Sequence, residues 1–193
     1  MRVRERGFSL VELLCVLAGI LVLGGVSLPY VKAYAVEAHL LGSARTFVGE
    51  FRQARSVAIR RNTQTAIRFE KRGGVDYYST YVDGNRNGVR SVDIASGVDK
   101  RISGPLPLHG RAHGVRVGIN PGVPAMPPDT GVLDPSDPIR FGSSNMLSFS
   151  PLGTATPGTF YLAGETLQAG VRVTAGSSRV RLMICRGQHW SER

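Results

Sequence analysis

Cysteine is scarce in this sequence, which has only Cys15 and Cys185 among its 193 residues. Cys15 lies inside an apolar run, whereas Cys185 lies near the C-terminal end. A disulfide requires the two Cα atoms to lie within roughly 7 Å of each other. If the apolar run spans a membrane, the two thiols cannot meet within one subunit. We therefore expect two free thiols and no disulfide framework.

Signatures of catalysis and of metal binding are also missing. The sequence has no Gly-x-Ser-x-Gly elbow, no phosphate-binding glycine loop and no paired-acid signature. His109 and His113 are four residues apart, but Gly110 and Gly114 follow them. A helix that would place both imidazoles on one face is therefore not expected there, and two histidines alone do not make a metal site. We expect a protein that is not an enzyme and that holds no cofactor.

Acidic residues are few compared with basic ones, at 14 against 24, which gives a net charge of +10. Three arginines and one glutamate in the first seven residues account for +2 of this charge, leaving +8 for the rest. Such a surplus favours anionic partners: nucleic acid, anionic lipid or an acidic face of another subunit. The alternative is a solvated surface that is rich in arginine.

Long hydrophobic runs are limited to one, at residues 8–28, which reads FSLVELLCVLAGILVLGGVSL and contains Glu12 as its single charge. A helix of this length extends about 30 Å, which matches the hydrocarbon core of a bilayer. Arginines flank only its N-terminal side. The positive-inside rule therefore leaves the short N-terminal segment in the cytoplasm and the rest of the chain exported.

Two simpler interpretations of this run explain it less well. A secretory signal peptide has a shorter apolar core that ends at a small-residue cleavage site. Here the small residues Gly24, Gly25 and Ser27 lead directly into another helix-like stretch. A plain membrane anchor does not explain Glu12, because a carboxylate at membrane depth costs about 2.5–3.5 kcal/mol.

Residues 6–14, which read RGFSLVELL, resemble the type III signal of type IV pilins and type II secretion pseudopilins. The resemblance implies that a prepilin peptidase cleaves after Gly7 and methylates the new N-terminal residue, Phe8. Glu12 is then the fifth residue of the mature chain. It pairs with the positive N-terminus of a neighbouring subunit, which relieves its unpaired charge in lipid. The implied location is the bacterial inner membrane with the head in the periplasm, and the implied partners are other pilins and the peptidase.

The apolar pattern changes after residue 28. Pro29 lacks a backbone donor and is expected to kink the helix. Residues 34–61 then carry apolar side chains at steps of three and four, which predicts an amphipathic helix that stops at Asn62. The arginines of this segment fall mostly outside the apolar stripe and are interpreted as solvated rim residues: Arg45, Arg52, Arg55, Arg60 and Arg61.

Beyond Asn62 the pattern has a period of two, which is typical of strands. The predicted strands cover residues 65–69, 77–82, 115–119, 139–141, 146–149, 159–162, 171–174 and 179–185. Residues 120–138 hold most of the prolines without periodicity, which predicts a long loop. The predicted fold is α+β, with a long N-terminal transmembrane and amphipathic helix packed on an antiparallel β-rich head. The predicted boundaries are a leader at 1–7, the transmembrane half of the helix at 8–28, its periplasmic half at 29–62 and the head at 63–193.

Residues 51–62, 149–155 and 179–181 resemble the H-type minor pseudopilins and FimT-like proteins. This likeness implies a minor structural subunit of a type II secretion pseudopilus or a related filament. The alternative is a FimT-like minor pilin that binds DNA for natural transformation through a C-terminal Gly-Arg-x-Arg element. Ser178 stands here in place of that glycine. The candidate DNA contacts are Arg179, Arg181 and Arg186.

Residues 83–88, which read DGNRNG, resemble the first half of a calcium-binding loop. Asp83, Asn85 and Asn87 would supply oxygen ligands, with Asp93 nearby. However, Ile94 stands where such a loop requires an acidic ligand. The competing interpretation is an Asn- and Gly-rich turn between strands.

Overall fold

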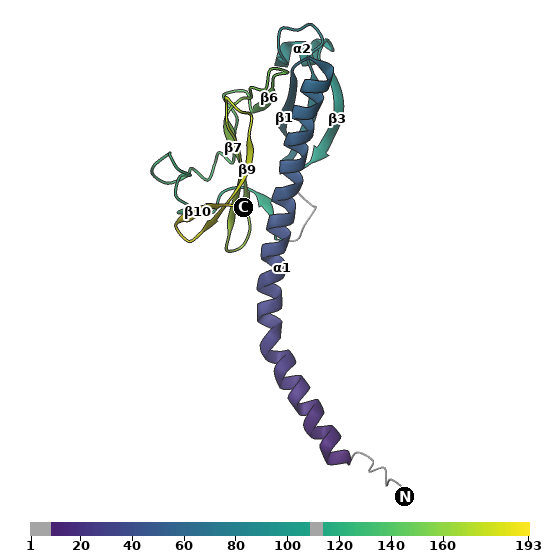
Figure 1. Cartoon of the computed structure of the whole chain (residues 1–193), viewed down its shortest axis with the longest axis vertical. Helices are drawn as coiled ribbons and strands as arrows, with labels where there is room; N and C mark the ends of the chain where they lie inside the picture. Colours follow the sequence, from purple (N-terminus) through teal and green to yellow (C-terminus); the bar gives the residue numbers. More distant parts are fainter. Residues whose placement is uncertain (1–8, 109–113) are drawn as a thin grey trace, which may run out of the picture. The chain divides into compact units, whose positions relative to one another are not determined.

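The computed structural model describes residues 9–108 and 114–193, without the side chains of Leu28, Pro29 and Ala33 (Figure 1). The predictions for Gly7, Phe8, His109 and His113 therefore lie outside the described residues. The chain divides into two compact units, Met1–Val36 and Glu37–Arg193.

Helix α1 (Leu10–Arg61) begins at a capped end and stops where the sequence predicts. The backbone N–H of Glu12 donates to the Ser9 hydroxyl at 3.2 Å, which satisfies one of the free donors of the first turn. At the other end, Asn62 takes the left-handed conformation with φ 48°, which asparagine tolerates better than most residues. The backbone is helical through Pro29, and the kink stays a prediction.

The first sheet has four antiparallel strands in the order β3-β2-β1-β6. Its strands are β1 (Thr65–Arg72), β2 (Val75–Val82), β3 (Lys100–Pro107) and β6 (Met146–Phe149). The pairing of β3 with β2 shifts register twice, between Tyr78 and Thr80 and between Thr80 and Tyr81. A short helix, α2 (Ser91–Ser96), precedes β3, and its residue Ile94 packs against the buried side chains of Ala66, Tyr81, Val89 and Met146.

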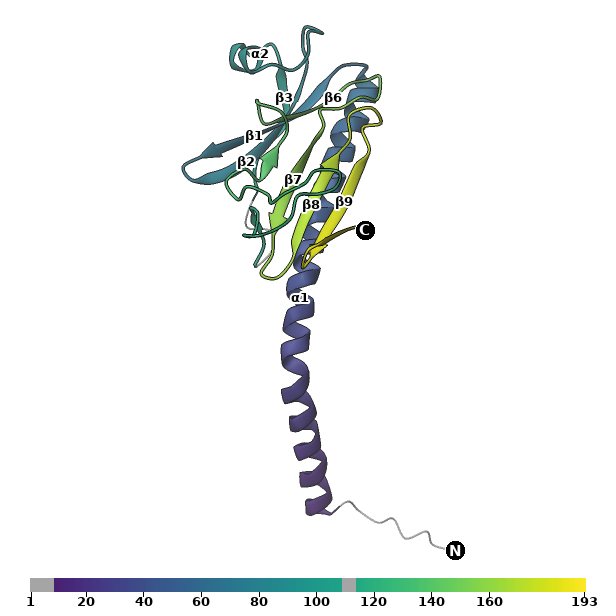
Figure 2. The ribbon, with the colours of Figure 1, turned by 90° about the vertical axis from the view of Figure 1, so that its left-hand side faces the viewer.

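The second sheet has six antiparallel strands in the order β10-β9-β8-β7-β4, with β5 also paired to β7. Its neighbouring strands β7, β8 and β9 lie side by side in Figure 2. Its strands are β4 (Arg116–Val117), β5 (Ile139–Arg140), β7 (Gly158–Ala163), β8 (Gln168–Val173), β9 (Val180–Arg186) and β10 (His189–Glu192). Buried Gln168 fixes the segment that leads out of β4. Its side-chain amide donates to the carbonyls of Gly118 and Leu162 at 2.9 Å each.

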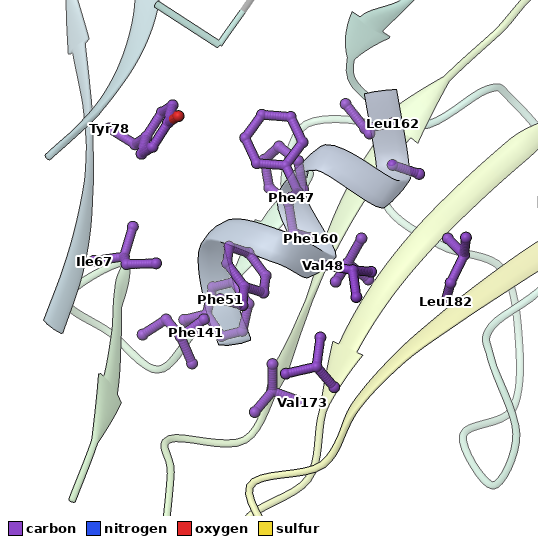
Figure 3. Packing of buried hydrophobic residues seen from close by; sticks show 14 of the residues in the cluster. Phe47, Val48, Phe51, Ile67, Tyr78, Phe141, Phe160, Leu162, Val173 and Leu182 are labelled. Carbon is purple, nitrogen blue, oxygen red and sulfur yellow. The ribbon is translucent and has the colours of Figure 1, made fainter. Parts of the chain in front are cut away.

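One hydrophobic core joins the helix of the second unit to both sheets (Figure 3). Helix residues at steps of three and four supply one wall of it: Leu40, Ala44, Phe47, Val48, Phe51, Ala54 and Ala58. Phe51 lies edge-on to Phe141 with ring centroids 5.9 Å apart, and Phe69 of β1 stacks on Phe160 of β7 at 5.6 Å. The apolar stripe predicted from the sequence is therefore the face of the helix that the sheets cover.

Residues 119–133 cover the other face of the six-stranded sheet. Ile119, Val123, Met126 and Leu133 pack there with Tyr161, Cys185 and Trp190. The Trp190 indole N–H donates to the Pro124 carbonyl at 2.9 Å, and Arg172 donates to the Pro127 carbonyl at 2.7 Å. Within this described stretch the only β pairing is an isolated bridge between Pro124 and Val132, so the predicted long loop is confirmed.

The predicted α+β fold is confirmed, with three elements that the sequence did not predict: α2, β3 and β10. Two of the predicted strands are shorter than expected, because β4 contains only Arg116–Val117 and β5 only Ile139–Arg140. Both cysteines are free, as predicted, with Cys15 exposed and Cys185 buried.

Candidate functional site

The first unit presents a continuous apolar surface. The segment Leu10–Ser27 has a mean hydropathy of 2.4, which makes it long and apolar enough to cross a membrane. Its large side chains are exposed, as Leu21 at 75% and Leu23 at 72% illustrate. An apolar surface of this size requires lipid or other protein to cover it.

Glu12 lies in the first turn of this apolar helix. Ser9 and Glu12 have the spacing of a capping box, in which a serine precedes the helix and a glutamate occupies its third position. A carboxylate in the first turn also interacts favourably with the positive end of the helix dipole. The Ser9 hydroxyl thus caps the start of α1, a contact that the Ser-x-x-Glu spacing indicates although the sequence analysis did not include it.

The second unit contains a groove of about 760 Å³ between α1 and the C-terminal strands. Arginines line both of its sides: Arg45, Arg52, Arg55 and Arg60 from α1, and Arg179, Arg181 and Arg193 from the C-terminal segment. We call this feature the arginine groove. Among the described residues that line it, Glu192 carries the single acidic side chain. Its carboxylate lies 3.2 Å from Arg179 and 3.6 Å from Arg181.

Two of these arginines have an unsatisfied nitrogen. The Nε atoms of Arg55 and Arg181 are buried, and neither has a hydrogen-bond partner in the described part of the chain. A buried donor without an acceptor costs about 1–3 kcal/mol, and more when it belongs to a charged group. The arginine groove is therefore a place where an added acceptor would be favourable.

The comparison with known protein families matches residues 43–180 to the family model of type II transport protein GspH. The match spans more than half of the chain and contains most of the second unit. The chain belongs to the GspH family. No curated protein and no solved structure matches it significantly.

Of the three predicted DNA contacts of this GspH-family chain, the structure brings two together. Arg179 and Arg181 line the arginine groove, whereas Arg186 is not among the residues that line it and pairs with Glu37 of α1. Four of the five helix arginines that the sequence places on a solvated rim, all except Arg61, line the opposite side of the same groove. The sequence does not indicate that these two groups of arginines lie close together, because they are more than a hundred residues apart.

Ser178, which precedes Arg179, adopts the backbone conformation of a glycine. Its φ is 43°, in the left-handed region, and its side chain is fully buried. Its hydroxyl has no hydrogen-bond partner within the described residues. The turn into β9 therefore keeps the geometry that glycine favours, although the sequence places serine there.

The Asp83 loop of this GspH-family head is held by its own backbone. The Asp83 carboxylate accepts hydrogen bonds from the N–H groups of Asn85, Arg86 and Gly88 at 3.1, 2.7 and 2.7 Å. The nearly buried carboxylate of Asp99 accepts from Gly84 and Arg90 at 3.0 and 2.9 Å.

Two other candidate calcium ligands, Asn85 and Asp93, are also engaged. The Asn85 side-chain amide donates to the Asp93 carboxylate at 3.4 Å, and the Asn85 side-chain oxygen accepts from the backbone N–H of Asn87 at 3.3 Å. In the described ranges, no three His, Cys, Asp or Glu side chains are grouped so that they could hold a metal ion. This geometry favours the turn over the calcium loop, since the Asp83 and Asp99 oxygens already serve as acceptors within the loop.

Cys185 lies in β9 of the six-stranded sheet, where its side chain is packed in the core. Burial raises the pKa of its thiol above the ordinary value of 9.0, so the thiol stays protonated at neutral pH. Burial likewise raises the pKa of Tyr161, with which it packs. A thiol of this kind is a poor nucleophile, because the reactive form is the thiolate.

Proposed function

We propose that the chain is a minor pseudopilin, a structural subunit of a type II secretion pseudopilus or a related filament. The observation that carries the proposal is the combination of a GspH-family head with an exposed apolar segment at the start of one helix. A filament subunit needs both parts, one to anchor and pack the chain and one to present a surface. No catalytic chemistry enters this role.

The proposed route to the filament begins at the N-terminal signal. A prepilin peptidase cleaves between Gly7 and Phe8 and methylates Phe8, and the head lies on the periplasmic side of the inner membrane. In this scheme Glu12 offers its carboxylate to the terminal amine of a neighbouring pilin, because an unpaired charge in lipid is costly. That pair fixes the axial position of the subunit while apolar helix faces pack.

Mass spectrometry of the N-terminal peptide tests this proposal. In cells that contain a prepilin peptidase, the mature chain is expected to begin at Phe8 and to carry one added methyl group. The same cells without the peptidase are the control and should retain Met1 to Gly7. An intact leader in peptidase-positive cells would contradict the proposed processing.

A second candidate function is binding of DNA for uptake, as in a FimT-like minor pilin. The observation that favours it is that Arg179 and Arg181 line one basic groove with the arginines of α1. Contacts to about three phosphates would give a slope near −3 for log affinity against log salt concentration. Arg179→Ala with Arg181→Ala should flatten that slope by nearly two if both side chains contact phosphate, and should change nothing if neither does.

We rank DNA binding second because of one feature of the groove. Among the described lining residues, none is aromatic, whereas proteins that hold single strands stack bases on aromatic side chains.

A further inference from the structure

We propose that the arginine groove binds an acidic, partly apolar peptide segment of a partner protein, and that Glu192 occupies the position of one partner carboxylate until that segment binds. The inference goes beyond the role of filament subunit. It concerns residues 45–193 alone and does not depend on the membrane anchor or its processing.

The positive charge of the groove requires a partner with negative charge. Seven arginine side chains and one glutamate line a space of about 760 Å³. Guanidinium groups that line one groove repel one another, and this repulsion is relieved when anionic groups enter between them. A chain with the same net charge of +10 is a poor source of that anion, so a second copy fits less well than a different, acidic protein.

The unsatisfied nitrogens indicate which anion fits. The Nε atoms of Arg55 and Arg181 come from the two opposite sides of the groove, and both lack an acceptor among the described residues. A carboxylate can accept from Nε and a terminal nitrogen of one guanidinium at the same time, in the paired geometry that arginine favours. Because both Nε atoms are buried, each side chain must rotate to present that edge to a bound ligand.

Glu192 shows that a carboxylate is accommodated here. Its oxygens contact Arg179 and Arg181 at 3.2 and 3.6 Å, and its side chain is 42% exposed. Ion pairs at this level of exposure contribute little to stability. Glu192 is therefore a weakly held internal occupant that a partner carboxylate can displace.

The remaining lining residues favour a peptide over a nucleic acid. Among the aliphatic residues that line the groove, Ile59 is 51% exposed, whereas Val48, Val180 and Leu182 belong to the buried core. The exposed Ile59 side chain can contact an aliphatic side chain of a peptide and offers nothing to a phosphodiester backbone. The groove thus combines basic sides with an exposed aliphatic contact, which is the complement of a segment that carries both acidic and apolar residues.

Binding of labelled peptides to the full chain in nonionic detergent tests the proposal by fluorescence anisotropy. The probes are a poly-glutamate peptide, a peptide of the same length with leucine at every third position, and single-stranded and duplex oligonucleotides of similar length. The leucine-containing peptide should bind more tightly than poly-glutamate although it carries fewer charges. Both peptides should bind more tightly than either oligonucleotide at the same salt concentration.

Variants assign the binding to the groove. Arg55→Gln with Arg181→Gln should weaken peptide binding by about tenfold or more, since two charge-assisted contacts are lost. Arg55→Lys with Arg181→Lys should also weaken it, because lysine keeps the charge and loses the paired geometry. Glu192→Gln should strengthen binding by roughly threefold, because the internal competitor is removed.

A matched control removes the same charge elsewhere. Arg90→Gln with Arg101→Gln changes two exposed arginines that do not line the groove and should alter binding by less than about twofold. The single tryptophan, Trp190, reports by its fluorescence whether each variant is folded. Equal losses in the two double variants would overturn the proposal, as would an oligonucleotide that binds more tightly than both peptides. Weaker binding by the Glu192→Gln variant would overturn the role of Glu192.

Discussion

The ring of Phe47 packs against the ring of Phe160, with centroids 4.6 Å apart. Phe47 belongs to α1 and Phe160 to β7, so this contact ties the helix directly to the six-stranded sheet. Phe47 also lies edge-on to Tyr78 of β2 at 5.7 Å. One helix side chain therefore contacts both sheets, and the arginine groove depends on it because the groove lies between the same helix and the same sheet.

Phe47→Ala is expected to lower the free energy of unfolding of the head by about 3–5 kcal/mol, because the buried ring leaves a cavity shared by helix and sheets. Phe47→Leu fills most of the space and should cost less. Chemical denaturation followed by Trp190 fluorescence measures both. A Phe47→Ala chain as stable as the parent would mean that α1 is not held to the sheets by this ring.

Glu12→Ala is expected to leave membrane insertion intact and to abolish incorporation into filaments. Removing the charge makes insertion easier by about 2.5–3.5 kcal/mol, while the proposed pair with a neighbouring amine is lost. Ser9→Ala is the matched control, because it removes the helix cap at a cost of about 1 kcal/mol and keeps the carboxylate. Immunoblots of membrane and sheared-filament fractions give the result. Equal incorporation of both variants would show that the Glu12 carboxylate is not needed for assembly.

Asp83→Ala is expected to lower the unfolding free energy by about 2–3 kcal/mol, because three backbone N–H groups lose their acceptor. Asp134→Ala, at an exposed turn where the carboxylate accepts from Ser136 alone among the described residues, should cost less than about 1 kcal/mol. Thermal melts with calcium and with a chelator should agree for the parent chain. A calcium-dependent rise in melting temperature that disappears in Asp83→Ala would instead identify a metal loop.

Ser178→Gly is expected to raise the unfolding free energy by roughly 1 kcal/mol. The change relieves a left-handed residue and removes a buried hydroxyl without a partner, and these gains exceed the extra entropy of glycine in the unfolded chain. Ser177→Gly, at an exposed neighbouring position, should not stabilise the chain. Denaturation midpoints of the two variants decide the matter, and a destabilised Ser178→Gly would show that the serine side chain contributes packing.

The sequence predicts most of the strands because successive side chains along them face different surroundings. Strands β1, β7 and β8 present alternate side chains to the helix and to the opposite face, and β7 and β8 are buried along almost their whole length. Strand β3 has no such pattern, since its first four residues are exposed and Gly104, Pro105 and Pro107 interrupt it. Strand β10 and helix α2 are too short to show a period.

The arginine groove could not be predicted in the same way. The arginines of α1 and the Ser-Arg-Val-Arg segment can each be recognised in the sequence. Only the packing of the helix on the second sheet places them on one groove. Sequence spacing carries no information about a contact between residues so far apart. The Asp83 loop shows the opposite case, since its Asn- and Gly-rich composition already indicated the self-bonded turn that the structure contains.

The irregular edge of the four-stranded sheet has a consequence for crowded subunits. Strand β3 carries Lys100 and Arg101 in exposed positions, lacks two amide donors at Pro105 and Pro107, and shifts register twice against β2. Such an edge is a poor template for a strand from another molecule. Heads that meet at this edge along the proposed filament are therefore expected to touch through their side chains and not to join into a continuous intermolecular β-sheet there.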